Sequence, residues 1–222
     1  MGHSNLFSGA EQAFSIPSTV NKIVFVPLAL ALVAAYVVGS IDFAVIIGRM
    51  HGVDIHEVGS GNPGTSNVLR TLGKGPAIMV LLGDTLKGVI GAAMGWVASG
   101  DANPLGPWVF AAGLAAVIGH CYPVFHKFRG GKGVATGFGV LIFTMPLVAV
   151  IVGLSWAILT KITKTASVSS MIVVSGTIPL AFWQGVSGMA WVWLLATIAL
   201  VVWRHKANIQ RMARGTEEKV TT

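Results

Sequence analysis

The sequence predicts an all-α polytopic integral membrane protein with seven transmembrane helical segments. Three observations support this fold class. Of the 222 residues, 54% are hydrophobic and only 10% are charged, whereas a soluble domain carries roughly 25% charged residues. Long apolar runs cover most of the chain. The basic residues lie between these runs, in a pattern that assigns the loops to the two sides of a membrane.

The apolar runs set the number of helices. A membrane-spanning helix needs about 20 mostly apolar residues. The six runs are 23–48, 76–98, 107–125, 134–160, 168–185 and 188–202. Pro146 lies at the middle of the fourth run, where its ring would break or kink a helix. That run is therefore either one tilted, kinked helix or two short helices that meet at Pro146.

The basic residues decide between these alternatives, because Lys and Arg in short loops mark the cytoplasmic side. If the fourth run is two segments, every Lys and Arg except Lys22 and Lys87 falls on one side. This places the N-terminus outside and the C-terminus in the cytoplasm. The pair around Pro146 is either two spans or re-entrant, with the same sidedness. The net charge of +7 then reflects this bias, and no nucleic-acid partner is expected.

The chain is expected to form one membrane domain in the lipid bilayer. Residues 1–22 are interpreted as an N-terminal extension, residues 23–204 as the seven-helix domain and residues 205–222 as a basic cytoplasmic tail. Cys121 is the only cysteine, so a disulfide within the chain is impossible. No basic segment precedes the first apolar run, which is therefore expected to be an anchor that stays in place.

A first polar cluster spans residues 59–75, with the sequence GSGNPGTSNVLRTLGKG. Its glycines permit close backbone approach, and successive exposed N–H groups can bind an anion. Arg70 adds a forked cation. Hydrogen-bond donors come from Ser60, Asn62, Thr65, Ser66 and Asn67. The alternative interpretation is a flexible loop followed by a helix that Ser66 caps.

A second cluster spans residues 119–136, with the sequence GHCYPVFHKFRGGKGVAT. A glycine-rich turn that opens a helix is a ready phosphate site, because its N–H groups are free and the helix dipole favours an anion. Lys132 adds a point charge. The spacing is not that of a nucleotide-binding P-loop. The residues expected to bind phosphate are Gly130, Gly131, Gly133 and Thr136. His120 has two equally favoured interpretations, a structural histidine and a functional one.

Two further clusters are predicted at the same face. Ser167, Ser169 and Ser170 open the fifth apolar run, and N-capping is the preferred interpretation for two of the three. In the tail, His205 and Asn208 are three residues apart and share one helical face. The basic residues in and just before the tail, namely Arg204, Lys206, Arg211 and Arg214, are mostly attributed to anionic lipid.

Charged groups within the apolar runs are few. Asp84 and Lys87 are three residues apart on one predicted helix and can therefore pair. They form either a structural ion pair or a support for a site, since charges at membrane depth are usually paired or functional. The six histidines are scattered, no His-x4-Asp pair is present, and no metal or cofactor is expected.

These motifs resemble a known family. The stretches GSGNPGTSNVLRTLGK, GHCYPVFHKFRGGKGVAT and RHKANIQRMARGTEEK are similar to the three signature regions of the bacterial acyl-phosphate–glycerol-3-phosphate acyltransferases, the PlsY family. The resemblance runs from about residue 36 to residue 219. It implies a seven-helix enzyme of the cell inner membrane with its active site at the cytoplasmic face. It also places Arg70, Lys132, Ser170, His205 and Asn208 at the family's catalytic and substrate-binding positions. The resemblance further implies that the same pocket is lined by Ser60, Asn62, Ser66 and Asn67.

The implied reaction transfers a fatty acyl group from acyl phosphate to the 1-hydroxyl of glycerol 3-phosphate. It yields lysophosphatidic acid and phosphate, in the first acylation step of phospholipid biosynthesis. Both substrates are anions and phosphate is a good leaving group, so the site needs cations and N–H donors more than a strong base. We therefore expect direct attack without an acyl-enzyme, with either a phosphate oxygen or His205 accepting the proton. The rival class, a small-anion transporter, fits less well because the polar clusters gather at one face.

Overall fold

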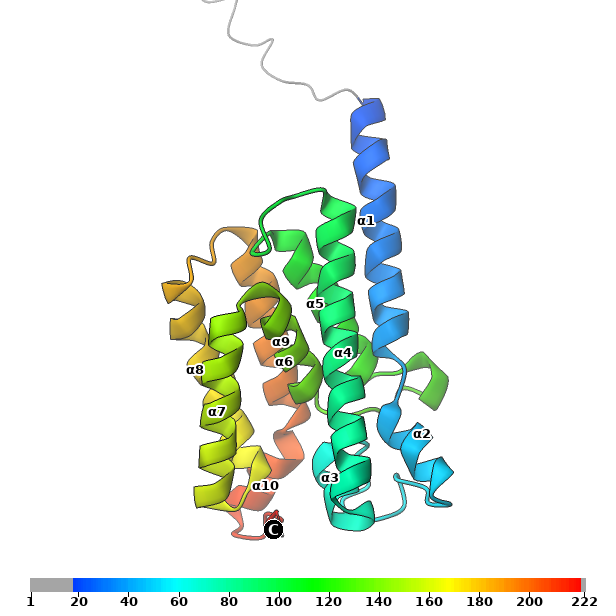
Figure 1. Ribbon diagram of the computed structural model, residues 1–222, viewed down its shortest axis with the longest axis vertical. Helices are drawn as coiled ribbons and strands as arrows, with labels where there is room; N and C mark the ends of the chain where they lie inside the picture. The colour runs from blue at the N-terminus through cyan, green and yellow to red at the C-terminus, as the bar shows by residue number, and fades with distance from the viewer. Residues whose placement is uncertain (1–17, 221–222) are drawn as a thin grey trace, which may run out of the picture.

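The computed structural model describes the backbone of residues 18–220 and the side chains of residues 27–220. All regular secondary structure in this part of the chain is helical, as predicted (Figure 1). The helices are α1 Ser18–Gly39, α2 Phe43–Met50, α3 Thr65–Leu72, α4 Lys74–Ser99, α5 Pro107–Cys121, the short 3₁₀ helix η1 Val124–His126, α6 Val134–Thr144, α7 Pro146–Thr163, α8 Ala166–Trp183, α9 Met189–Arg204 and α10 Lys206–Ala213.

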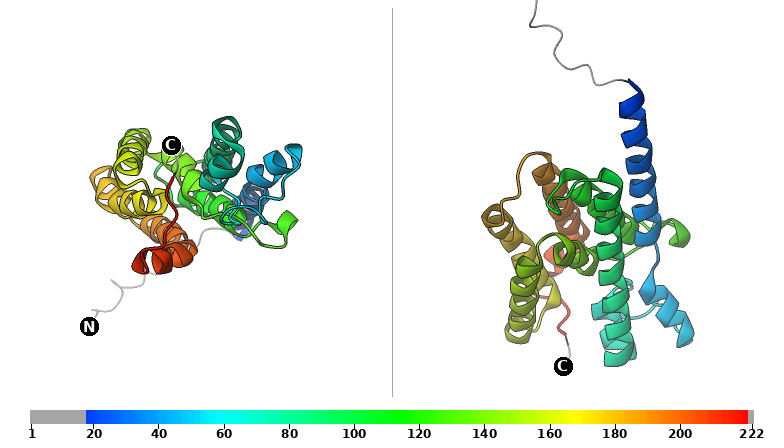
Figure 2. Two further views of the ribbon diagram at one scale, coloured as in Figure 1. Left: turned by 90° about the horizontal axis from the view of Figure 1, so that it is seen from below. Right: turned by 45° about the horizontal axis from the view of Figure 1, so that its top comes forward.

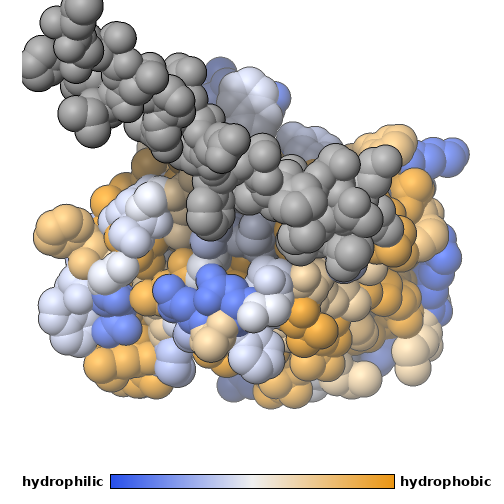
Figure 3. Space-filling model, turned by 90° about the horizontal axis from the view of Figure 1, so that it is seen from above, coloured by the Kyte–Doolittle hydropathy of each residue, from blue (hydrophilic) through white to orange (hydrophobic). Residues whose placement is uncertain are grey.

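Five apolar segments are long enough to cross a membrane, namely Pro27–Met50, Lys74–Ser99, Pro107–His126, Pro146–Thr163 and Ala166–Trp183. Helices α6 and α9 are shorter and also apolar. Large apolar side chains cover the outside; Val97 and Ile162 are each 72% exposed and Phe182 is 77% exposed. From above, hydrophobic residues form much of the visible surface around a smaller hydrophilic group (Figure 3). Such a surface fits lipid, while the count of seven spans and their sidedness stay predictions.

The break predicted at Pro146 is confirmed. Helix α6 ends at Thr144, and α7 begins at Pro146 itself. Proline is tolerated in the first turn of a helix because the N–H group that it lacks would have no partner there. Helix α6 is short, with 11 residues, but α7 has 18, so only the first half of the fourth run is a short helix.

The first apolar run was predicted as one helix, and this prediction is wrong. Helix α1 ends at Gly39 and α2 starts at Phe43. The carboxylate of Asp42 caps α2 by accepting a hydrogen bond from the N–H of Val45 at 3.1 Å. The Lys87 ammonium donates to the carbonyl oxygen of Ile41, which the break leaves free, at 2.9 Å. At its other end, α1 begins at Ser18, inside the predicted extension, whose residues 1–17 lie outside the described part of the chain.

Helix α4 is the centre of the fold and packs against α1, α5 and α6. Glycines let α4 and α6 approach closely. A Cβ atom on Gly88 would collide with the carbonyl oxygen of Thr136, and one on Gly139 would collide with that of Thr85. This contact fixes the first turn of α6 and therefore the glycine-rich segment that leads into it.

The polar segments gather at the lower end of the bundle in Figure 1, where α2, α3 and α10 lie. The chain that follows α10 does not extend away from the protein. Seen from below, it crosses the lower end of the bundle (left view of Figure 2). The N–H of Val220 donates to the carbonyl oxygen of Lys164, at 2.7 Å, in the turn between α7 and α8. The predicted tail is therefore part of the fold.

Candidate functional site

Three segments meet at this end: a first loop (residues 51–64), a glycine-rich loop (residues 127–133) and a tail (residues 214–220). A Cβ atom added to Gly131 would lie 2.8 Å from the carbonyl oxygen of Pro63, so the two loops touch. Arg70, at the end of α3, pairs with Glu218 of the tail at 2.6 Å. The charges of both residues act on Lys132 of the glycine-rich loop. The structure thus brings the first, second and fourth predicted clusters together.

The first loop is shaped by Asn67, which is only 1% exposed. Its amide oxygen accepts a hydrogen bond from the N–H of Ser60 at 2.9 Å. Its amide nitrogen donates to the carbonyl oxygens of Ile55, at 3.2 Å, and Val58, at 3.0 Å. Asn67 was predicted to line a pocket, but these bonds commit its side chain to the loop backbone.

Ser60 connects this loop to Arg70, whose guanidinium donates to the Ser60 hydroxyl at 3.3 Å. The half-buried Asn62 lies farther along the loop, beside Gly64. Ser66 does not cap a helix, because Gly64 is the N-cap of α3 and Ser66 lies in its first turn. The alternative interpretation of Ser66 as a cap is therefore wrong.

The glycine-rich loop is held from two sides. The N–H of Gly131 donates to the carbonyl oxygen of His120 at 3.0 Å. The Arg204 guanidinium donates to the carbonyl oxygens of Gly131, at 3.0 Å, and Gly130, at 2.6 Å. The attribution of Arg204 to lipid is therefore wrong, since its side chain turns into the fold. Gly133 has φ +86°, a conformation that a residue with a Cβ rarely adopts.

Thr136, in the first turn of α6, and Lys132, just before this helix, differ in accessibility. Thr136 is fully buried, with its carbonyl oxygen against Gly88 of α4. Lys132 is half-buried and forms no ion pair with any residue of the described chain. Burial lowers the pKa of Lys132 from 10.5 to about 8, and the nearby Glu217 opposes this shift. Below that pH, Lys132 offers a positive charge that a substrate anion can neutralise.

His205, at the junction of α9 and α10, is buried with 2% of its side chain exposed. Its Nδ1 lies 2.7 Å from the carbonyl oxygen of Val201. In the neutral ring, Nδ1 therefore carries the proton and Nε2 is an acceptor. Burial, together with the nearby charge of Lys132, lowers the pKa of His205 to about 4, although the hydrogen bond to the Val201 carbonyl opposes this shift. The imidazole is thus neutral near pH 7.

The tail contributes a carboxylate that sequence reasoning missed. Glu217 Oε1 accepts hydrogen bonds from the Ser167 hydroxyl at 2.7 Å and the Asn208 amide at 2.6 Å. Its other oxygen pairs with Arg211 at 2.8 Å. Burial alone would raise the pKa of this carboxyl, but the three hydrogen bonds outweigh it and hold the pKa below its usual value. The amide oxygen of Asn208 is buried without a partner among the described residues.

The serines of α8 do not cap it. The N-cap residue is Thr165, and no side-chain capping bond forms. The hydroxyls of Ser169 and Ser170 instead donate to the carbonyl oxygens one turn back, at 3.1 and 2.8 Å. The Trp156 indole donates to the Ser170 hydroxyl at 3.0 Å. The N-capping interpretation is therefore wrong, and Ser167 joins the tail while Ser170 faces α7.

A buried cluster lies behind the glycine-rich loop. The predicted pair of Asp84 and Lys87 is confirmed, with 2.7 Å between the carboxylate and the ammonium. His120 Nδ1 lies 3.5 Å from the same carboxylate oxygen. The other ring nitrogen of His120 lies so close to Gly131 that a Cβ there would collide with it. The cluster therefore connects the α1–α2 break, through Lys87, to the glycine-rich loop, through His120.

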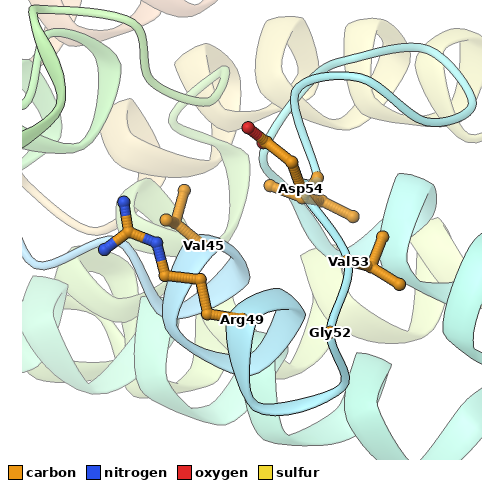
Figure 4. Close-up of a pocket in the computed structure, with 6 residues that line it drawn as sticks. Val45, Arg49, Gly52, Val53 and Asp54 are labelled. Carbon is orange, nitrogen blue, oxygen red and sulfur yellow. The ribbon is translucent and has the colours of Figure 1, made fainter.

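Two hollows lie outside this polar site. One, of about 260 Å³, lies between α2 and the first loop and is lined by Val45, Arg49, Gly52, Val53, Asp54 and Ile55 (Figure 4). No predicted site residue lines it. The other is an apolar groove of about 340 Å³ between α7 and α8. Ile172 and Val173, which line it, follow Ser170 within one helical turn.

Comparison with known proteins gives one consistent result. The family model described as glycerol-3-phosphate acyltransferase matches residues 29–215. The chain is 44% identical to the glycerol-3-phosphate acyltransferase of Rubrobacter xylanophilus. This match spans 194 residues, or 86% of this chain and 94% of that relative. The chain is 41% identical to the enzyme of the same name from Bacillus subtilis over 194 residues, or 87% of this chain and 97% of the relative.

Two solved structures share the fold. Both are crystal structures of PlsY, described as an integral membrane glycerol 3-phosphate acyltransferase, and both are 35% identical to this chain. The glycerol 3-phosphate form has a TM-score of 0.82 and covers 88% of this chain and 96% of its own. The lysophosphatidic acid form has a TM-score of 0.79, with 86% and 94% covered.

Proposed function

Because the chain belongs to the glycerol-3-phosphate acyltransferase family and is an integral membrane acyltransferase of the PlsY type, we propose the following reaction for it. It transfers a fatty acyl group from acyl phosphate to the 1-hydroxyl of glycerol 3-phosphate, giving lysophosphatidic acid and phosphate. One observation supports this most directly. Two carboxylates of the tail lie among the cations of the site, Glu218 on Arg70 and Glu217 on Arg211. A site that attracts two anionic groups of its own chain suits two anionic substrates.

Arg70 of α3 and Lys132 of the glycine-rich loop each supply one part of anion binding. Arg70 presents a guanidinium, which fits a phosphate with two parallel hydrogen bonds. Lys132 presents an unpaired ammonium next to the free N–H groups at the start of α6, where the helix dipole favours an anion. Holding both substrates in one site makes the attack effectively unimolecular, which is worth about 7–11 kcal/mol in well-oriented systems.

The chemistry follows from the remaining groups. The glycerol hydroxyl attacks the acyl carbon, the bond from that carbon to the phosphate oxygen breaks, and the hydroxyl proton passes to a phosphate oxygen. His205 accepts a hydrogen bond from the attacking hydroxyl through Nε2, and the Asn208 amide oxygen is a second acceptor. A pKa of about 4 makes His205 a weak base near pH 7, since efficient general bases have pKa values near the working pH.

The acyl chain needs an apolar channel that opens to the bilayer. The groove between α7 and α8 has this character, because apolar side chains dominate its lining. The groove begins within one helical turn of Ser170. The Trp156 indole donates a hydrogen bond to the hydroxyl of this serine. We assign the acyl chain to this groove and the polar head to the cationic end of the bundle. The substrate then enters from the membrane without leaving the apolar phase.

Turnover with defined donors tests this proposal. Purified protein should form lysophosphatidic acid from glycerol 3-phosphate and acyl phosphate, and should fail with acyl-coenzyme A and with acyl carrier protein. Arg70→Ala and Lys132→Ala should abolish product formation with the protein still folded, because both side chains are only half-buried at the polar end of the bundle and truncation leaves no apolar cavity. Equal turnover with a thioester donor would exclude acyl phosphate as the dedicated donor.

The sidedness of the site is tested by labelling. We propose that the polar end faces the cytoplasm of an inner membrane. Ala102 and Lys219 are both exposed, and in the proposed orientation they face opposite sides of the membrane. The native Cys121 is buried and should not react. A membrane-impermeant thiol reagent should label Ala102→Cys in intact spheroplasts and Lys219→Cys only after the membrane is opened. Labelling of Lys219→Cys in intact spheroplasts would reverse the orientation.

A further inference from the structure

Arg204 lies at the end of α9 and makes three contacts with parts of the chain that are remote in sequence. Its Nε donates to the carbonyl oxygen of Gly131 and its Nη2 to that of Gly130. The guanidinium carbon also lies 5.0 Å from the centre of the Tyr122 ring. Tyr122 is fixed in turn, because its carbonyl oxygen accepts a hydrogen bond from the Tyr36 hydroxyl of α1 at 2.9 Å. The glycine-rich loop and Tyr122 therefore hold this side chain in one place.

The two carbonyl bonds fix the direction of the peptide groups in the glycine-rich loop. The described chain contains no cis peptide bond, and in a planar trans peptide the C=O and N–H point in opposite directions. Since the Gly131 carbonyl points at Arg204, the N–H of Lys132 points away from it. Likewise the Gly130 carbonyl points at Arg204 while the N–H of Gly131 points at His120. Arg204 and His120 thus determine the orientation of two consecutive peptide groups.

This orientation matters because the loop is built from glycines. Glycine adopts many backbone conformations at little cost, so the Gly130 and Gly131 peptides can rotate unless something holds them. A rotated peptide would place a carbonyl oxygen, the negative end of its dipole, toward the anion site beside Lys132. Arg204 removes that option by binding both oxygens. Two of its N–H donors, at Nε and Nη2, bind these oxygens, and Tyr122 lies against the face of the guanidinium, so these donors face the loop backbone and not a substrate.

We propose that Arg204 is the positioning residue of the anion site: it binds the Gly130 and Gly131 carbonyls on one side of the loop so that the Lys132 N–H faces the substrate phosphate on the other. This inference rests on the proposed function for the identity of that phosphate. Arg204 then acts through the loop, and its loss weakens anion binding more than it slows the chemical step.

The experiment compares Arg204→Gln, Arg204→Lys and the control Arg214→Gln. Arg214 is an exposed arginine at the end of α10, and its replacement removes the same charge. Arg204→Gln loses the two hydrogen bonds from the charged guanidinium to the loop carbonyls. Because bonds to charged groups are strong, KM for an anionic substrate should rise on the order of 10- to 100-fold. The value of kcat at saturation should change less than about fivefold by the same argument, because no contact with the reacting atoms is lost. Arg204→Lys should recover part of the affinity, since an ammonium lacks the fork that spans both carbonyls.

The affinity for inorganic phosphate, measured by calorimetry on the purified protein, tests this inference separately from the proposed reaction. If wild type turns over no acyl phosphate, the proposed function fails, whereas weaker phosphate binding by Arg204→Gln than by Arg214→Gln still supports the positioning role. Equal phosphate affinity in wild type and Arg204→Gln overturns it, as does a lower Tm with unchanged KM. If Arg204→Gln does not fold, Tyr122→Leu is the second variant. It should raise KM in the same direction by a smaller factor, and an unchanged KM there also refutes the role.

Discussion

If a substrate anion binds Arg70 as we propose, Glu218 competes with it for the guanidinium, so removal of this carboxylate should improve substrate affinity. The carboxylate lies 2.6 Å from the Arg70 guanidinium. A substrate phosphate has to displace it before the guanidinium is free to bind. The change Glu218→Gln removes the competing charge and keeps the size of the side chain. We therefore expect a lower KM for glycerol 3-phosphate and an unchanged kcat.

The size of the effect follows from exposure. The Arg70 side chain is 19% exposed and that of Glu218 is 40% exposed, so solvent screens the pair strongly. Exposed ion pairs contribute about 0.2–1 kcal/mol, which corresponds to a KM lower by about 1.4- to 5-fold. Salt screens such pairs, so the difference between wild type and variant should shrink as ionic strength rises.

Steady-state kinetics at two salt concentrations measure this effect. The matched control is Glu57→Gln, because Glu57 is an exposed carboxylate of the first loop and its loss changes the net charge equally. A KM that rises in Glu218→Gln would mean that the carboxylate orients Arg70 instead of competing for it. An equal decrease of KM in Glu57→Gln would show that the effect comes from the overall surface charge and not from the Arg70–Glu218 pair. Either result would refute the reasoning.

Three further predictions concern the loop, the imidazole and the helix packing. The charge of Lys132 is lost as pH rises through about 8, so wild-type kcat/KM should fall above that pH. Lys132→Arg stays charged and should not show this fall. A flat wild-type profile of kcat/KM from pH 7 to 10 would contradict the lowered pKa of Lys132. His205→Gln should raise KM and lower kcat by less than about 10-fold, whereas a kcat loss of about 100-fold or more with unchanged KM would establish base catalysis. Gly88→Ala should destabilise the protein by about 1–3 kcal/mol, seen as a lower Tm, because the new methyl group meets the Thr136 carbonyl. Gly137→Ala, with open space around it, is the control, and an equal Tm loss there would show that helix contact is not the cause.

Much of the fold was predictable because its causes are local. The apolar runs set the helices, since each backbone polar group in lipid has to be satisfied within a helix. Pro146 ended one helix and began the next by its own covalent geometry. Asp84 and Lys87 met because residues three apart share a helix face. The glycines around Lys132 likewise indicated the turn before α6.

The errors share a different cause. The break between α1 and α2 was missed because Ser40 and Asp42 interrupt the apolar run only slightly, and the group that satisfies the freed Ile41 carbonyl, Lys87, is 46 residues away. Arg204 was assigned to lipid because its neighbours in sequence are basic. Its actual partners, Gly130 and Gly131, are 73 and 74 residues away. Sequence spacing carries no signal for such pairs.

The sequence by itself determined the helical membrane fold, the glycine-framed cations and the face on which they gather, because periodicity, proline geometry and charge placement are properties of short segments. Only the tertiary structure decided which groups are free to act. It committed Asn67 to the first loop, folded Glu217 and Glu218 back among the cations and left Nε2 of His205 as an acceptor. A polar group's availability depends on which remote partner satisfies it once water is excluded, and that partner is set by packing.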